Sequence, residues 1–164
     1  MNSAVKDTTG AGKTLDKLLN WWDRLTFNHE TEFPATADVL IQDYEYEWQL
    51  LRHLEVSRLQ SRYPFIETIL EKVIHEQRNQ MQILKDKIAE LSGEEPQAAS
   101  PDAPREIGVP LSLDIQYAHE LYDLYRQQIP MFDHAGMQAF LESMAEAKRR
   151  QAQTLLELAP KFHN

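Results

Sequence analysis

Two glutamates stand at equivalent positions of a repeated pattern, and their placement is the first sign of possible chemistry. Glu47 and Glu120 are each the acidic residue of a Tyr-x-x-Glu-(Trp/Leu)-x-x-Leu motif, which begins at Tyr44 and again at Tyr117. In a helix, this spacing places the carboxylate in the middle of an otherwise apolar stripe. A buried charge needs a compensating partner, so the two motifs predict a polar centre within an apolar core.

Each motif is followed by a second amphipathic segment, and these two segments also match. In order, Ile66, Ile69, Leu70, Val73, Gln77, Gln80 and Leu84 correspond to Met137, Phe140, Leu141, Met144, Lys148, Gln151 and Leu155. The repeat predicts two helical hairpins of similar construction. Each second segment carries two polar residues at i, i+3 spacing, which places both on one helix face.

Together these positions form one candidate site at the centre of a bundle. The site comprises Glu47, Gln77, Gln80, Glu120, Lys148 and Gln151. One glutamate from each of two helices, with an i, i+3 pair from each of two others, is the arrangement of ligands in a di-iron carboxylate bundle.

Four long helices are needed to position these residues, and the sequence predicts them. The expected helices cover residues 36–62, 65–91, 112–128 and 133–158. Tyr63-Pro64 and Pro130 separate the helices within each hairpin, and Pro160 is expected to end the last one. No strand pattern is present, so the sequence predicts an all-α fold.

The remaining segments complete the predicted domain organisation. Residues 92–110 contain four prolines and two glycines without helical periodicity, which favours a long crossover between the hairpins. The four-helix bundle is expected to occupy residues 36–164. Residues 1–12 are expected to be a disordered tail, followed by a short helix and connector over 13–35.

In helix order, repeat, crossover and the positions of Glu47 and Glu120, residues 36–158 resemble the ferritin-like superfamily in its rubrerythrin-type branch. The resemblance implies a di-iron oxidase or peroxidase with Glu-x-x-His on the second and fourth helices. Here these motifs read Gln77-x-x-Gln80 and Lys148-x-x-Gln151, and no histidine in the chain has a glutamate three residues before it. The metal motifs of the family are therefore lost.

The charge of the remaining residues argues against a metal pair at this centre. Glu47 and Glu120 supply only two negative charges, whereas two divalent ions need several anionic or imidazole ligands. Lys148 adds a cation at the same place. We therefore expect Lys148 to replace the metal and to pair with both glutamates, with the glutamines completing the hydrogen bonds. In the alternative, Lys148 extends to the surface and the glutamates are partly exposed.

Composition bounds the remaining possibilities. The chain of 164 residues is expected to form one domain, and the absence of cysteine excludes disulfides and thiolate sites. The formal net charge of −9 argues against nucleic acid or an anionic membrane as partner. No apolar run suffices for a membrane span and no secretion signal is evident, so a cytoplasmic protein is expected.

The sequence leaves three functions open. The first is a non-catalytic structural, interaction or regulatory protein without a cofactor. The second is an iron- or manganese-dependent oxidase or iron-handling protein. Its candidate metal ligands are Glu47, Glu120, Glu76 and His75, with Glu71 and His119 as further candidates. The third is a bundle whose vacated centre binds a small molecule.

The expected partner is a second copy of the chain or another protein. The predicted first and third helices carry more aromatic residues than one stripe can bury: Tyr44, Tyr46, Trp48, Tyr117, Tyr122 and Tyr125. Trp21 and Trp22 add two indoles to the N-terminal segment. Aromatic side chains are enriched in protein interfaces, so the sequence predicts a homodimer.

Overall fold

The fold was obtained as a computed structural model that describes residues 36–97 and 111–162. In these ranges the chain forms α2 (Thr36–Gln60), α3 (Pro64–Ser92), α4 (Ser112–Gln128), the short 3-10 helix η1 (Ile129–Met131) and α5 (Ala135–Phe162). No strand occurs among the described residues, so the predicted all-α class with four long helices is confirmed. The predicted tail over 1–12, the segment 13–35 and most of the crossover lie outside the described residues.

The helix ends follow the local chemistry of proline and glycine. Tyr63 is extended (φ −117°, ψ 124°) and Pro64 opens α3, as expected where proline restricts the residue before it. At the other end of α3, Gly93 adopts a left-handed conformation (φ 78°), and its N–H donates to the carbonyl of Ala89 at 2.8 Å. Such a glycine cap satisfies a carbonyl at the helix end.

The prediction that Pro160 ends the last helix was wrong, because α5 continues to Phe162. Proline lacks an N–H, so the carbonyl of Leu156 loses its usual helical donor. This loss falls in the last turn, where carbonyl groups lie close to solvent and helix ends already contain unpaired groups. A proline at this position is therefore tolerated.

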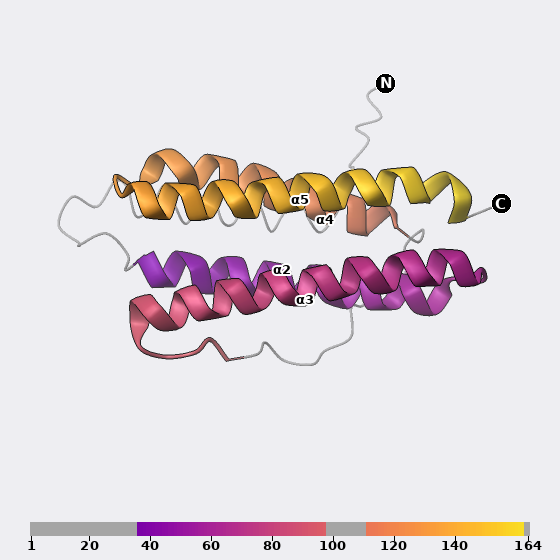
Figure 1. Ribbon diagram of the computed structural model, residues 1–164, viewed down its shortest axis with the longest axis horizontal. Coiled ribbons are helices and arrows are strands. Elements are labelled where there is room, and N and C mark those ends of the chain that lie inside the picture. Colours follow the sequence, from indigo (N-terminus) through magenta and orange to yellow (C-terminus); the bar gives the residue numbers. More distant parts are fainter. Residues whose placement is uncertain (1–35, 98–110, 163–164) are drawn as a thin grey trace, which may run out of the picture. The chain divides into compact units, whose positions relative to one another are not determined.

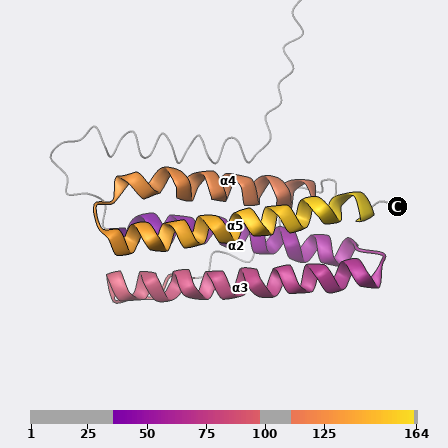
Figure 2. The same ribbon diagram turned by 45° about the horizontal axis from the view of Figure 1, so that its top comes forward.

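Two helical hairpins, α2–α3 and α4–α5, make up the bundle (Figure 1). They meet where α2 packs on α4 and α3 packs on α5. Ser57 near the end of α2 contacts Asp114 at the start of α4, and Lys87 near the end of α3 lies over Phe140 near the start of α5. Both pairs are thus antiparallel. Since α3 and α4 are each antiparallel to α2, they run in the same direction, as Figures 1 and 2 show.

The core consists of the predicted apolar stripes, which face one another between the hairpins. Residues of these stripes that are buried include Leu40, Tyr44, Leu51, Leu54, Ile66, Leu70, Val73, Leu84, Tyr117, Leu121, Leu124, Met137, Leu141, Met144 and Leu155. Burial of these faces is the main favourable contribution to folding. Among the described residues, no helix is long and apolar enough to cross a membrane.

Six of the aromatic residues that motivated the homodimer lie on α2 and α4, and they are more covered than the sequence suggested, whereas Trp21 and Trp22 lie outside the described residues. Tyr44, Tyr117 and Tyr125 are buried inside the bundle, and the other three, Tyr46, Trp48 and Tyr122, are half-buried. The helices therefore cover more of this aromatic surface than one stripe each would. The homodimer stays a prediction.

Candidate functional site

Lys148 of α5 lies at the centre of the bundle and is completely buried. It follows Met144 by one helical turn on the apolar stripe of α5, so the helix directs its side chain inward. Its ammonium nitrogen Nζ lies 2.5 Å from Oε2 of Glu47 on α2, which is also completely buried. This buried ion pair therefore joins α5 to α2, which belong to different hairpins.

Two glutamines complete the coordination of this ammonium group. Lys148 Nζ donates to Oε1 of Gln77 at 2.5 Å and to Oε1 of Gln151 at 3.0 Å. With the contact to Glu47, this gives three acceptors for the three N–H donors of a protonated lysine. The ammonium group is thus fully hydrogen-bonded without water, which meets the main requirement for a charge in an apolar interior.

Glu47 is bonded through both of its carboxylate oxygens. Gln77 Nε2 donates to Oε2 at 2.6 Å and to the main-chain carbonyl of Glu47 at 2.9 Å. The phenol of Tyr125 on α4 donates to Oε1 at 2.7 Å. Gln151 Nε2 donates to Gln77 Oε1 at 3.0 Å and closes the network. All four helices thus contribute to one polar cluster, which we call the lysine cluster: Glu47, Gln77, Tyr125, Lys148 and Gln151.

The electrostatics of the lysine cluster are those of one balanced ion pair. Burial lowers the pKa of Lys148, and the negative charge of Glu47 together with its hydrogen bond opposes this shift. Burial, followed by the charge of Glu47, raises the pKa of Tyr125 well above its ordinary value. Tyr125 therefore remains a neutral phenol that donates to Glu47, and the charges of Lys148 and Glu47 cancel.

Glu120, predicted to pair with Lys148, does not join the lysine cluster. It is half-buried and accepts a hydrogen bond from Gln116 on its own helix at 3.1 Å. Burial raises the pKa of Glu120. One ammonium group neutralises one carboxylate, so a second buried carboxylate would lack compensation. The prediction that Lys148 pairs with both glutamates was therefore wrong for Glu120.

Gln80 also lies apart from the lysine cluster. Its side chain is half-buried, and its carbonyl oxygen Oε1 has no hydrogen-bond partner among the described residues. Of the six positions predicted from the sequence, Glu47, Gln77 and Gln151 meet around Lys148, whereas Glu120 and Gln80 do not.

Three residues of the core polar network had not been singled out as site residues. Tyr125 was counted only as an aromatic residue. Asp43 and Gln128 are buried and joined by a hydrogen bond from Gln128 Nε2 to Asp43 Oδ1 at 2.8 Å. Helical spacing was the available signal, because Asp43 precedes Glu47 by one turn and Gln128 follows Leu124 by one turn.

A further polar contact joins α2 to α4 towards the opposite end of α2. Ser57 donates to a carboxylate oxygen of Asp114, and both side chains are buried. Burial raises the pKa of Asp114 to about 6, although the hydrogen bond from Ser57 acts in the opposite direction. With the pairs Glu47–Tyr125 and Asp43–Gln128, this makes the surface between α2 and α4 unusually polar for a core. We call this surface the α2–α4 seam.

The residues proposed as alternative metal ligands are not brought together. His75 and Glu76 are exposed on α3, whereas Glu47 is completely buried. Among the described residues, no group of three or more histidine, aspartate or glutamate side chains could hold a metal ion. The donor set at the bundle centre also does not fit a metal, because the cationic Lys148 lies among the oxygen atoms that a metal would use.

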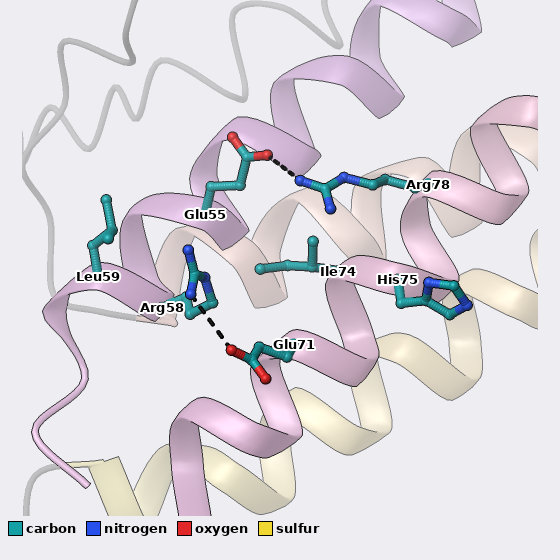
Figure 3. Close-up of a pocket in the computed structure, with 7 residues that line it drawn as sticks. All are labelled: Glu55, Arg58, Leu59, Glu71, Ile74, His75 and Arg78. Carbon is teal, nitrogen blue, oxygen red and sulfur yellow. Dashed lines mark hydrogen bonds and ion pairs between the residues drawn. The ribbon is translucent and has the colours of Figure 1, made fainter. Parts of the chain in front are cut away.

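His75 instead lines a surface pocket of about 520 Å³ between α2 and α3 (Figure 3). Arg78 pairs with Glu55 at 2.9 Å, and Arg58 pairs with Glu71 at 3.5 Å. These ion pairs connect the two helices across the pocket and balance its charges. Exposed ion pairs of this kind typically contribute little energy, and with its charges paired the pocket does not indicate a particular ligand.

Comparison of the chain with models of protein families, with curated proteins and with solved structures gave no match.

Proposed function

We propose that this chain is a ferritin-like bundle in which an internal ion pair takes the place of the metal centre, and that it acts as a non-catalytic interaction or regulatory protein. The observation that carries the proposal is the contact of Lys148 Nζ with Glu47 Oε2 at 2.5 Å, with both side chains fully buried. A cation at this point repels a metal ion and neutralises the carboxylate that would bind it.

The direction of the helices supports the ferritin-like part of the proposal. The contacts Ser57–Asp114 and Lys87–Phe140 make α2–α4 and α3–α5 antiparallel, so α3 and α4 are parallel. This is the order of a bundle with one crossover between two hairpins.

The saturated hydrogen bonds of the lysine cluster support a non-catalytic role. A nucleophilic lysine must present a neutral amine to a substrate, whereas Lys148 directs its three donors to Glu47, Gln77 and Gln151. None of these side chains is more than slightly exposed. The cluster therefore favours a structural role over catalysis.

A surface role is supported by apolar side chains at the end of the α2–α3 hairpin. Leu59 is 77% exposed and Phe65 is 52% exposed, and the Tyr63 ring lies 5.9 Å from that of Phe65. We call these three residues the apolar corner. These exposed apolar residues fall within seven positions of the chain, and exposed apolar surface of this kind is typical of surfaces that bind other proteins.

Metal analysis tests the absence of a metal centre. The full chain, purified without chelators and then incubated with ferrous iron, is expected to hold no stoichiometric iron, manganese or zinc by elemental analysis. Two tightly bound metal ions per chain would overturn the proposal, because their ligands would then lie outside the lysine cluster.

A variant with the family motifs restored provides the positive control. It combines Gln77→Glu, Gln80→His, Lys148→Glu and Gln151→His, which places two carboxylates and one imidazole in the lysine cluster and a second imidazole at position 80, one turn further along α3. We expect this variant to bind iron under conditions in which the parent does not. If the variant folds, as shown by circular dichroism, and fails to bind iron, the ferritin-like register of α3 and α5 is incorrect.

A further inference from the structure

Two buried oxygen atoms on the α2–α4 seam lack the hydrogen-bond donor that each needs. They are Oδ2 of Asp43 and Oε1 of Gln128, and both are without a partner among the described residues. The exposed fractions of the two side chains are 0% and 1%. Unpaired polar atoms are uncommon in protein interiors, because burial removes their bonds to water.

The two unpaired atoms belong to side chains that are already bonded to each other. Gln128 Nε2 donates to Asp43 Oδ1 at 2.8 Å. The oxygen Oε1 of Gln128 can only accept a hydrogen bond, and so can Oδ2 of Asp43 when the carboxylate is ionised. Neither atom can therefore donate to the other. One proton on Asp43 changes this, because a protonated carboxyl group has one donor as well as acceptor capacity.

We propose that Asp43 and Gln128 form a proton-binding site that links α2 to α4. With the proton on Oδ2, Asp43 donates to Gln128 Oε1 while Gln128 Nε2 donates to Asp43 Oδ1. The two planar groups then form a cyclic acid–amide pair with two parallel hydrogen bonds. A single proton thereby satisfies both unpaired oxygen atoms.

The charged groups around Asp43 favour its neutral form. From α2, Glu47 and Tyr46 interact with it, and from α4 Tyr125 and Gln128 do so. The lysine cluster contributes Lys148 from α5, whose charge is already paired with Glu47, and the neutral Gln77 from α3. No cation in this set is directed at Asp43. Burial is the largest cause that raises the pKa of Asp43, to about 8, and the charge of Glu47 adds to it.

The sign of the pH dependence follows from this arrangement. The folded chain holds the Asp43 proton up to about pH 8, whereas the unfolded chain releases it at the ordinary pKa of an aspartate, about 3.9. The contribution of the acid–amide pair to stability is complete below the unfolded pKa and is lost as the pH rises towards 8. Between these two pKa values the folded chain binds one proton more than the unfolded chain. Each rise of one pH unit therefore decreases the folding equilibrium constant about tenfold.

Asp43→Asn provides the matched test, because asparagine has the shape of a protonated aspartate and can form the same two bonds at every pH. The free energy of unfolding of the full chain is measured with urea between pH 5 and pH 8 for the parent, for Asp43→Asn and for Asp38→Asn. Asp38 is an exposed carboxyl in the first turn of the same helix. We expect Asp43→Asn to remove about a tenfold change per pH unit from the parent's pH dependence, and Asp38→Asn to leave that dependence unchanged.

A second measurement on the parent does not depend on a folded variant. The carboxyl carbon of Asp43 is followed by NMR from pH 4 to pH 9, and we expect its midpoint above pH 7. An ordinary midpoint near 4 would overturn the proposal and would favour a buried water molecule between Asp43 and Gln128. An unchanged pH dependence in a folded Asp43→Asn variant would overturn it as well.

Discussion

At the scale of single residues, the core depends on how one ammonium group is satisfied. The three donors of Lys148 match the acceptors of Glu47, Gln77 and Gln151, and Tyr125 completes the bonding of Glu47. Breaking a buried ion pair is usually more harmful than replacing the whole pair, because the surviving charge is left in an apolar interior. This asymmetry gives the lysine cluster a clear experimental signature.

We expect Lys148→Ala to destabilise the fold by about 3–5 kcal/mol, as is typical when one partner of a buried pair is removed. Lys148→Met leaves less of a cavity and separates the effect of charge from that of volume. The free energy of unfolding at neutral pH, measured with urea, checks both variants. Arg150→Ala, at an exposed position on the same helix, is the control and should change stability little.

Removal of both charges of the ion pair is expected to restore part of the lost stability. Glu47→Gln combined with Lys148→Met should regain part of the stability that Lys148→Met loses, because no buried charge is then left unpaired. A Lys148→Ala variant as stable as its parent would show that the ion pair does not support the core.

At the scale of the helices, the end of α3 depends on a backbone conformation that favours glycine. Gly93 has φ 78°, and apart from its two chain neighbours no residue has an atom within 4 Å of the place where a Cβ would stand. Substitution at this residue therefore tests backbone strain without a steric clash. The Gly93 N–H also bonds to Ala89, so a change of conformation here would release the cap of α3.

We expect Gly93→Ala to lower the free energy of unfolding by about 1 kcal/mol, because the left-handed region is unfavourable for residues with a Cβ. Gly93→Asn should lose less, since asparagine tolerates this region better. Thermal unfolding followed by circular dichroism compares the two variants with the parent. Equal stability of Gly93→Ala and the parent would mean that residue 93 does not need its positive φ.

At the scale of the whole molecule, the described bundle combines a polar seam in its core with apolar groups on its surface. The two aspartates of the α2–α4 seam, Asp43 and Asp114, both have a pKa raised by burial. The apolar corner lies outside, where Leu59 and Phe65 stay exposed. The charges of the lysine cluster are paired with each other inside the bundle, so we expect contacts with a partner to come from the surface.

We expect the full chain to form a homodimer at high micromolar concentration, with the apolar corner at the interface. Leu59→Ser combined with Phe65→Ser should weaken the dimer, because burial of these side chains would drive association. Light scattering during size-exclusion chromatography measures the mass of both proteins. Ile83→Ser, which alters another exposed apolar residue of α3, is the control. A parent that elutes as a clean monomer would contradict the prediction.

The sequence by itself determined the four helices and the faces that they bury, because helical periodicity and the conformations of proline and glycine are local properties. It also indicated that Gln77, Lys148 and Gln151 face inward, since they continue apolar stripes. Among the boundaries of the four long helices, only the end of α5 differed markedly from the prediction. A helix tolerates the hydrogen bond lost at Pro160 because of its place in the last turn, which the residue type alone does not reveal.

Which of its two predicted carboxylate partners Lys148 contacts was decided by the tertiary structure alone. Glu47 and Glu120 occupy equivalent motifs, yet Glu47 bonds to Lys148 and Glu120 bonds to Gln116. Which side chains meet depends on the rotation and translation of each helix against its neighbours, and the periodicity of one helix contains neither quantity. Tyr125 satisfies Glu47, and Gln128 bonds to Asp43, for the same reason. A single buried cation then needs only one carboxylate, which breaks the symmetry of the repeat at the centre of the bundle.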